Sequence, residues 1–443
     1  MTATTLSPAP STTDTTAPDR QAALKFITCG SVDDGKSTLI GRLLVDSRSV
    51  LQDQLDNVSK SGSADLALFT DGLSAEREQG ITIDVAYRYF ATPARKFIIG
   101  DTPGHEQYTR NMVTAASSAD AAVVLVDATK LNWKDVADVT LLPQTRRHAL
   151  LLKLLRVPSI VFAVNKLDAL EDPERTKQAT EAFTRIRDAL ERFAEQAGIR
   201  IAATIPISAL QGHNVVGSNP GWCGYEGASL LHLLEQLPVT PADLAQPLAF
   251  PVQWVEKFSN SSNTHQGRRV FWGRVATGQA QVGQSVTVFP SGKSATIAQV
   301  LNHVRQPATV SANHSAGIVL DRELDVSRGD WLLADTAHLA PRQNISGTVA
   351  WMDDVPLVVG RTYWALHGHR WIKAKVLRIN HRLDINTLAQ APAEALEPNA
   401  IGHITLGLQQ PMAALGFGES RVLGSLILVD TATHTTAGAL LIE

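Results

Sequence analysis

The chain of 443 residues contains only two cysteines, Cys29 and Cys223, whose wide separation gives neither a disulfide framework nor metal-ligand spacing. Long hydrophobic runs are also missing, since no apolar stretch approaches the roughly 18 residues that a membrane-spanning helix needs. Basic charge is not in excess either: 40 lysines and arginines stand against 43 aspartates and glutamates, and the formal net charge is −3. These shortages predict a cytoplasmic protein that has no membrane partner and no global basic field for nucleic acid.

The first residues lack the features of a targeting signal. Residues 1–19 contain no basic side chain and are rich in threonine, serine, alanine and proline. A secretory signal begins with basic residues before an apolar core, and an organellar transit peptide is rich in arginine. Residues 1–20 are therefore expected to form a flexible tail.

What the sequence does contain is a glycine-rich loop between an apolar run and a helical stretch. The apolar run lies at residues 22–27, and the loop reads Gly-Ser-Val-Asp-Asp-Gly-Lys-Ser from Gly30 to Ser37. This order is typical of a phosphate-binding P-loop, where backbone N–H groups and a helix N-terminus face the phosphates. We expect Lys36 to reach the β- and γ-phosphates and Ser37 to ligate Mg²⁺. The residues expected around the phosphates are Gly30, Ser31, Val32, Asp33, Asp34, Gly35, Lys36, Ser37 and Thr38.

A second apolar run, at residues 97–100, leads into Asp101-Thr102-Pro103-Gly104-His105. An aspartate that ends an apolar strand can hold Mg²⁺ through water, so Asp101 is a candidate metal residue. The Gly104 N–H can contact a γ-phosphate, because only glycine allows so close an approach.

Two further motifs predict guanine as the base. Asn165-Lys166-Leu167-Asp168 follows an apolar run, and Asp168 can accept hydrogen bonds from N1–H and the 2-amino group of guanine. Adenine does not offer that pair of donors, so it would leave the carboxylate unpaired. Ser208, Ala209 and Leu210 follow another apolar run and fit the loop that offers a backbone N–H to guanine O6. The four motifs in this order indicate GTP.

The segment from Glu76 to Asp84 reads Glu-Arg-Glu-Gln-Gly-Ile-Thr-Ile-Asp and resembles the switch segment of translational GTPases. The resemblance implies that Thr82 completes the Mg²⁺ shell and closes over the γ-phosphate. It also implies that His105 orients the attacking water, although a histidine at this place could by itself be a surface or capping residue. Asp33 matches an aspartate that helps to hold a monovalent cation in this superfamily. The expected switch residues are Thr82, Asp101, Thr102 and Pro103.

The residues within and between these motifs resemble one branch of the elongation-factor-Tu-like superfamily, the GTPase (large) subunit of bacterial sulfate adenylyltransferase. Asp34 stands where elongation factor Tu has histidine. The resemblance covers about residues 21–443 and is carried by the P-loop and by six further runs, at residues 83–90, 144–148, 207–216, 349–353, 382–387 and 428–430.

This resemblance implies an activity and a partner. A separate small catalytic subunit would bind ATP and form adenylylsulfate and pyrophosphate from ATP and sulfate, as a step of sulfate assimilation. The present chain would bind GTP and Mg²⁺, hydrolyse the GTP and couple that reaction to the uphill synthesis.

The pattern along the chain predicts an α/β P-loop GTPase domain followed by two antiparallel β-barrel domains. Apolar runs alternate with helical stretches from Leu24 to about Leu237, which is typical of a mostly parallel sheet covered by helices. Short β-rich segments separated by turns follow a linker that contains three prolines. The expected boundaries are 21–240 for the GTPase domain, 241–340 for the second domain and 341–443 for the third.

Two other functions use the same motifs. The chain could carry aminoacyl-tRNA as an elongation factor does, but no basic docking surface is visible in the sequence. It could also be a regulatory GTPase without enzymatic coupling. Arg146, Arg147 and His148 could contact a phosphate or a partner, or simply lie on a solvated helix face.

Overall fold

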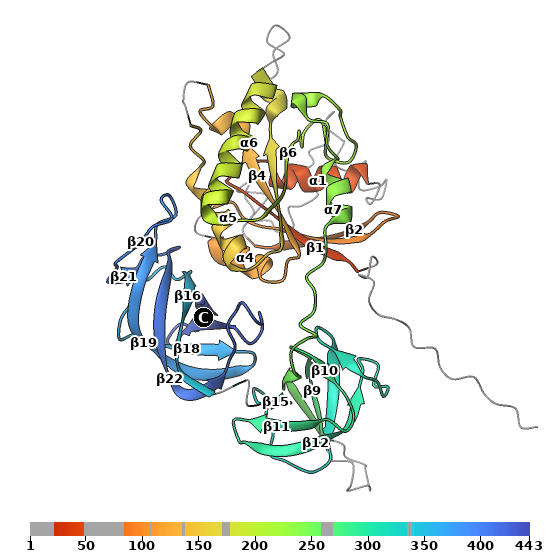
Figure 1. Ribbon diagram of the computed structural model, residues 1–443, viewed down its shortest axis with the longest axis vertical. Coiled ribbons are helices and arrows are strands. Elements are labelled where there is room, and N and C mark those ends of the chain that lie inside the picture. The colour runs from red at the N-terminus through yellow and green to blue at the C-terminus, as the bar shows by residue number, and fades with distance from the viewer. Residues whose placement is uncertain are drawn as a thin grey trace, which may run out of the picture.

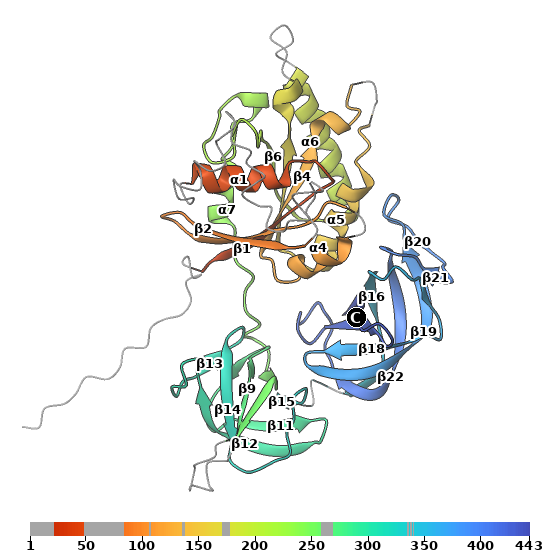
Figure 2. The same cartoon turned by 180° about the vertical axis from the view of Figure 1, so that it is seen from behind.

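The computed structural model describes residues 22–47, 84–105, 108–134, 138–170, 178–257, 269–334 and 341–443, together with Thr336 and Leu339. The expected tail and Thr82 lie outside the described residues. Figures 1 and 2 show three bodies: an α/β domain, and two β domains below it.

The first body is built on a six-stranded sheet with the order β2-β3-β1-β4-β5-β6. Strand β2 runs antiparallel to β3, and the other neighbouring pairs are parallel. Strands β4 and β5 are buried along their whole length, which explains their nearly unbroken apolar sequences. The strands are β1 (Leu24–Cys29), β2 (Ala86–Ala91), β3 (Lys96–Asp101), β4 (Ala121–Asp127), β5 (Ser159–Asn165) and β6 (Ile201–Pro206).

Helices cover both faces of this sheet, as predicted. Helices α1 and α7 lie on one face, and α4, α5 and α6 lie on the other (Figures 1 and 2). Helix α6 buries Phe183, Ile186, Leu190 and Phe193, which recur at helical spacing along one face. The helices are α1 (Lys36–Asp46), α4 (Thr109–Ala116), α5 (Pro143–Leu154), α6 (Gln178–Ala197) and α7 (Leu230–Gln236), with short 3₁₀ turns η3 (Ala128–Lys130), η4 (Leu167–Leu170) and η5 (Trp222–Gly224).

The second body is a seven-stranded antiparallel sheet with the order β7-β15-β11-β12-β14-β9-β8. An isolated bridge between Ala249 and Thr277 joins β7, one end of the sheet, to the segment after β9, the strand next to the other end. Its strands are β7 (Ala249–Pro251), β8 (Trp254–Lys257), β9 (Arg269–Arg274), β11 (Ser285–Phe289), β12 (Lys293–Leu301), β14 (Ser315–Leu320) and β15 (Trp331–Leu333), and β10 (Gln279–Ala280) pairs with β13 (Val310–Ser311).

The third body is a closed six-stranded antiparallel barrel, which confirms the predicted barrel at this end of the chain. The order is β18-β23-β24-β16-β22-β19, and the pairing of β18 with β19 closes it. Its strands are β16 (Pro341–Trp351), β18 (Thr362–His367), β19 (Arg370–Leu383), β22 (Ile401–Ala413), β23 (Ser425–Asp430) and β24 (Thr436–Ile442), with short additions β17 (Leu357–Val358), β20 (Gln390–Ala391) and β21 (Ala395–Leu396).

The third body packs directly on the first. Met352, Ile401 and Ala439 of the barrel belong to the same buried apolar cluster as helices α4, α5 and α6. Arg146 on α5 donates to the backbone carbonyls of Ile385 and Asn386 in the barrel, so it is a contact between domains rather than a solvated residue.

Within the described ranges, no helix is both long enough and apolar enough to cross a membrane.

Candidate nucleotide site

The predicted motifs meet at one edge of the first sheet. Gly30, Thr102 and Lys166 each lie directly after a parallel strand, namely β1, β3 and β5, and Ile207 lies directly after β6. The carboxyl ends of neighbouring parallel strands lie along the same edge, which is where doubly wound sheets bind ligands. The topology therefore brings four short motifs, spread over about 180 residues, into one site.

The phosphate loop leads into a helix end that has no side-chain cap. Gly35 stands at the N-cap of α1 with φ 91°, a left-handed conformation that favours glycine. Among the described residues, no side-chain cap hydrogen bond is found at this end of α1, and its first turn contains no acidic residue. Its N–H groups and positive dipole end are thus open to an anion.

Lys36 lies in the loop where a phosphate would bind. It is buried, and its Nζ donates to the Ser31 carbonyl at 2.7 Å and to the Gly30 carbonyl at 3.4 Å. Burial lowers the pKa of Lys36, and the charges of Asp101 and Asp34 oppose that shift. A Cβ on Gly104 would lie 2.9 Å from the backbone carbonyl carbon and oxygen of Ser31, so glycine is needed for the loop after β3 to come so close to the phosphate loop. That approach fits the expected role of Gly104 beside a γ-phosphate.

The side chains present fit a magnesium ion. Ser37 Oγ donates to Asp101 Oδ2 at 3.3 Å, and Thr28 Oγ1 donates to Asp101 Oδ1 at 3.1 Å. One hydroxyl beside one carboxylate suits an ion that is completed by water and phosphate oxygens. The described part of the chain contains no group of three or more His, Cys, Asp or Glu side chains that could hold a metal without those ligands.

The predicted switch residues after β3 form a short extended loop. The Thr102 hydroxyl donates to the Thr28 carbonyl at 2.7 Å and ties this loop to β1, and Pro103 follows it. His105 is half-buried, and its ring lies edge-on to the Tyr108 ring with centroids 6.2 Å apart. His105 thus follows directly on the glycine that approaches Lys36.

On the base side of the site, Asn165 joins two loops. Its Nδ2 donates to the Asp34 carbonyl at 2.9 Å, and its Oδ1 accepts from the Ala209 N–H at 3.0 Å. Because Ala209 is already bonded, the Leu210 N–H is the remaining candidate for guanine O6. Asp168 is the second residue of the 3₁₀ turn η4 and is partly exposed, and within the described ranges its carboxylate accepts no hydrogen bond. Its acceptors are therefore available to a base.

Comparison with known proteins decides the family. Residues 21–242 match the elongation factor Tu GTP binding domain, and residues 344–443 match the GTP-eEF1A C-terminal domain-like family. Sulfate adenylyltransferase subunit 1 of Laribacter hongkongensis is 40% identical over 94% of this chain and 84% of that protein. The chain belongs to the sulfate adenylyltransferase subunit 1 family.

Two other relatives support this membership in the subunit 1 family. The Salmonella typhi member is 40% identical over 96% of this chain and 86% of its own. A bifunctional enzyme CysN/CysC of Xylella fastidiosa is 43% identical over 94% of this chain, which spans 65% of that longer protein. These matches confirm the predicted family and the GTP-binding domain, and the elongation-factor alternative is the less supported of the two.

Sequence reasoning missed two residues in the nucleotide site of this subunit 1 family member. Arg42 on α1 donates to the Ala209 carbonyl at 3.2 Å and to the Leu210 carbonyl, so it ties α1 to the base loop. Lys130 on η3 lies 2.9 Å from Asp34 Oδ1. Neither belongs to a short motif, and both reach the site through long side chains that local sequence does not position.

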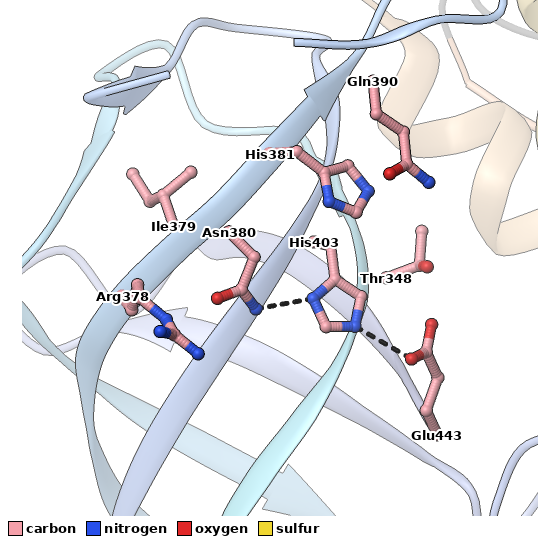
Figure 3. Close-up of a pocket in the computed structure, with 8 residues that line it drawn as sticks. All are labelled: Thr348, Arg378, Ile379, Asn380, His381, Gln390, His403 and Glu443. Carbon is pink, nitrogen blue, oxygen red and sulfur yellow. Dashed lines mark hydrogen bonds and ion pairs between the residues drawn. The ribbon is translucent and has the colours of Figure 1, made fainter. Parts of the chain in front are cut away.

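A separate hollow of about 610 Å³ lies on the barrel, on strands β16, β19 and β22 (Figure 3). His403 is its centre: Nδ1 is 2.6 Å from Asn380 Nδ2, and Nε2 is 2.9 Å from the Glu443 carboxylate. The His381 ring stacks on the His403 ring at 5.4 Å. The hollow shares no residue with the nucleotide site.

Proposed function

We propose that this chain hydrolyses GTP and couples the hydrolysis to formation of adenylylsulfate and pyrophosphate from ATP and sulfate on a separate small subunit. The observation that carries the proposal is the open α1 N-terminus with Lys36, Ser37 and Asp101 around it, in a chain of the subunit 1 family. The reaction and the existence of a second subunit are proposed from the relatives' name, sulfate adenylyltransferase subunit 1.

In the proposed mechanism the chain binds and orients GTP. Lys36 leaves the Ser31 carbonyl for the β- and γ-phosphates, and the amides of α1 and of Gly104 donate to the same oxygens. Magnesium, when bound, would neutralise phosphate charge, and Ser37 would hold it directly while Asp101 would hold it through water. Thr82 would complete that shell, and a monovalent cation beside Asp33 remains a prediction of the sequence.

His105 is proposed to orient the attacking water. A residue in that role holds a lone pair of the water toward the γ-phosphate and leaves GTP binding to other groups. Helix α4 begins four residues after His105, and on this helix Arg110 donates to the Met352 carbonyl of the barrel at 3.2 Å. If the switch changes conformation when the γ-phosphate is lost, the contact between Arg110 and Met352 could pass that change to the barrel.

Coupling requires an element with two conformational states, whose equilibrium is shifted by the ligands of both active sites. We place it in the Thr82 segment and the region from Gly104 to Asn111, and we propose that the small subunit docks near them. The cytoplasmic location stays a prediction.

The test is GTP hydrolysis by the full chain with and without the small subunit, ATP and sulfate, with adenylylsulfate followed in the same reaction. The proposal expects hydrolysis to rise with the complete mixture and adenylylsulfate to depend on GTP. A hydrolysis rate that none of the three additions changes would contradict the coupling and would favour the alternative of a GTPase that carries aminoacyl-tRNA.

His105→Ala tests the assigned role within the same assay. Because His105 is proposed to act on the water and not on GTP, the variant should bind GTP normally and hydrolyse it roughly 10² to 10⁴ times more slowly, with coupled synthesis lost. His303→Ala, an exposed histidine in the second domain, is the matched control. Full coupled turnover in His105→Ala would remove the histidine from the mechanism.

A further inference from the structure

The phosphate loop contains a buried acidic side chain, which is an unexpected charge in a site for polyphosphate. Asp34 is 0% exposed, and its Oδ2 accepts from the Ser31 N–H at 2.6 Å. The Ser31 carbonyl in turn accepts from Lys36 Nζ at 2.7 Å. Ser31 therefore links the Asp34 carboxylate to the phosphate-binding lysine through its own two hydrogen bonds. A negative charge at this place opposes the binding of GTP, because like charges repel more strongly where water is excluded.

Lys130 lies against this carboxylate from outside the loop. Its Nζ is 2.9 Å from Asp34 Oδ1, and it also donates to the Val32 carbonyl of the same loop. Lys130 ends η3, whose N-cap Asp127 accepts from the Thr129 N–H at 2.9 Å and from its hydroxyl at 2.6 Å. The turn after β4 therefore directs the lysine toward the loop.

The ion pair continues into the base-binding motif. Asp127 Oδ2 lies 3.8 Å from Lys130 Nζ and 2.8 Å from Lys166 Nζ, and Lys166 also donates to the Asp33 carbonyl at 2.6 Å. Carboxylates and ammonium groups thus alternate along this series of contacts, in the order Asp34, Lys130, Asp127 and Lys166. Burial raises the pKa of Asp34, and Lys130 is the first of the groups that oppose this shift.

We propose that Lys130 is a positioning residue for GTP: its ammonium neutralises the buried Asp34 carboxylate and so keeps the phosphate loop attractive to the triphosphate. The two side chains act as one unit, in which the acid shapes the loop by holding the Ser31 N–H and the lysine removes the electrostatic penalty of that acid. The inference rests on the proposed GTP site but not on its coupling to adenylyl transfer.

The test is a double-mutant cycle on the purified full chain, with a fluorescent GTP analogue and Mg²⁺ at pH 8. Lys130→Met should weaken GTP binding about tenfold or more, because it leaves a buried carboxylate without its counter-ion. Adding Asp34→Asn should return the affinity to within about threefold of the parent, because the charge is gone while the amide oxygen can still accept from Ser31. Lys130→Arg should retain binding, and Lys134→Met, an exposed lysine four residues on, is the matched control.

The cycle separates charge from tethering. If Lys130 acted only by tying the loop to η3, the double variant would bind GTP as weakly as Lys130→Met, and that result would overturn the proposal. A Lys130→Met variant whose GTP affinity lies within about twofold of the parent would overturn it as well. Should Lys130→Met fail to fold, Asp34→Asn alone decides: the proposal requires GTP binding that is equal or tighter, and a tenfold loss, about 1.4 kcal/mol, contradicts it.

These outcomes differ from a failure of the proposed function. A parent chain that does not bind GTP contradicts the proposed function itself. A parent that binds GTP but shows no coupling leaves the cycle interpretable.

Discussion

At the scale of single residues, Asn165 sets the geometry of the site before any ligand arrives. It ends β5, and its amide joins the phosphate loop to the base loop through two hydrogen bonds of 2.9 and 3.0 Å. Gly35 accommodates it, since a Cβ there would lie 2.5 Å from the Asn165 amide nitrogen. Asp168, three residues further on, is proposed to bind the base.

Asp168→Asn should change which base is preferred. The amide offers one donor and one acceptor in place of two acceptors, so it matches xanthine, whose C2 carries an oxygen, better than guanine. We expect GTP to bind more weakly and xanthosine triphosphate more tightly, which competition binding measures directly. Asp188→Asn, on the exposed face of α6, is the control. An unchanged preference for GTP would contradict the base-reading role.

The residues that sequence could propose are those that belong to a short motif. The P-loop glycines, Ser37, Asp101, Gly104 and Asn165 lie together at one edge of the sheet, and their roles toward GTP stay predictions. Lys130 and Arg42 could not be identified, because their roles depend on which loop lies across the sheet edge. The placement of Thr82, outside the described residues, stays a prediction.

At the scale of the element, helix α5 carries a histidine in its buried stripe. His148 is 0% exposed, and its Nε2 lies 2.8 Å from Gln144 Nε2 one turn earlier. Burial, with smaller contributions from Lys36 and Arg147, lowers the pKa of His148 to about 3. The sequence left open a phosphate or partner contact for this residue, and the structure places it inside the domain. In α6, by contrast, the apolar positions all share one buried face.

A neutral buried histidine makes the fold sensitive to acid. The unfolded chain protonates His148 near pH 6.5 while the folded chain resists to about pH 3, so the free energy of unfolding falls as pH drops through that window. The slope attributable to this residue should approach about 1.4 kcal/mol per pH unit. Chemical denaturation between pH 7 and pH 4 measures it.

His148→Leu should lower that slope and leave the contribution of His367, whose pKa burial lowers to about 4. His434→Ala, at an exposed turn, should leave the slope unchanged. A His148→Leu slope equal to that of the parent would show that the histidine is not neutral in the fold.

At the scale of the whole molecule, arginines join the nucleotide domain to the barrel through backbone carbonyls. Arg146 Nε donates to the Ile385 carbonyl at 3.0 Å, and its guanidinium lies 4.4 Å from the Phe193 ring centroid. Arg156 donates to the Phe417 carbonyl. Such contacts do not depend on the barrel's side chains, which is why no pairing of charges in the sequence could predict them.

Arg146→Ala should loosen this interface. Loss of charged hydrogen bonds and of the ring contact should lower the free energy of unfolding of the nucleotide domain by about 1–3 kcal/mol, as measured by chemical denaturation. Arg192→Ala removes only an exposed ion pair with Asp138 and should cost less than about 1 kcal/mol. Equal effects of the two substitutions would mean that Arg146 does not hold the domains together.

The apolar cluster shared between α4, α5, α6 and the barrel also bears on how the chain is made. Its members run from Ile27 to Ala439, so the face of the nucleotide domain under the barrel is completed by a strand that is synthesised long after the nucleotide domain. Between the synthesis of Ala197 and that of Ala439 lie roughly 240 residues, or about 12–50 seconds at 5–20 residues per second. During that interval a nascent GTPase domain carries an uncovered apolar face, which is the surface that a chaperone would recognise.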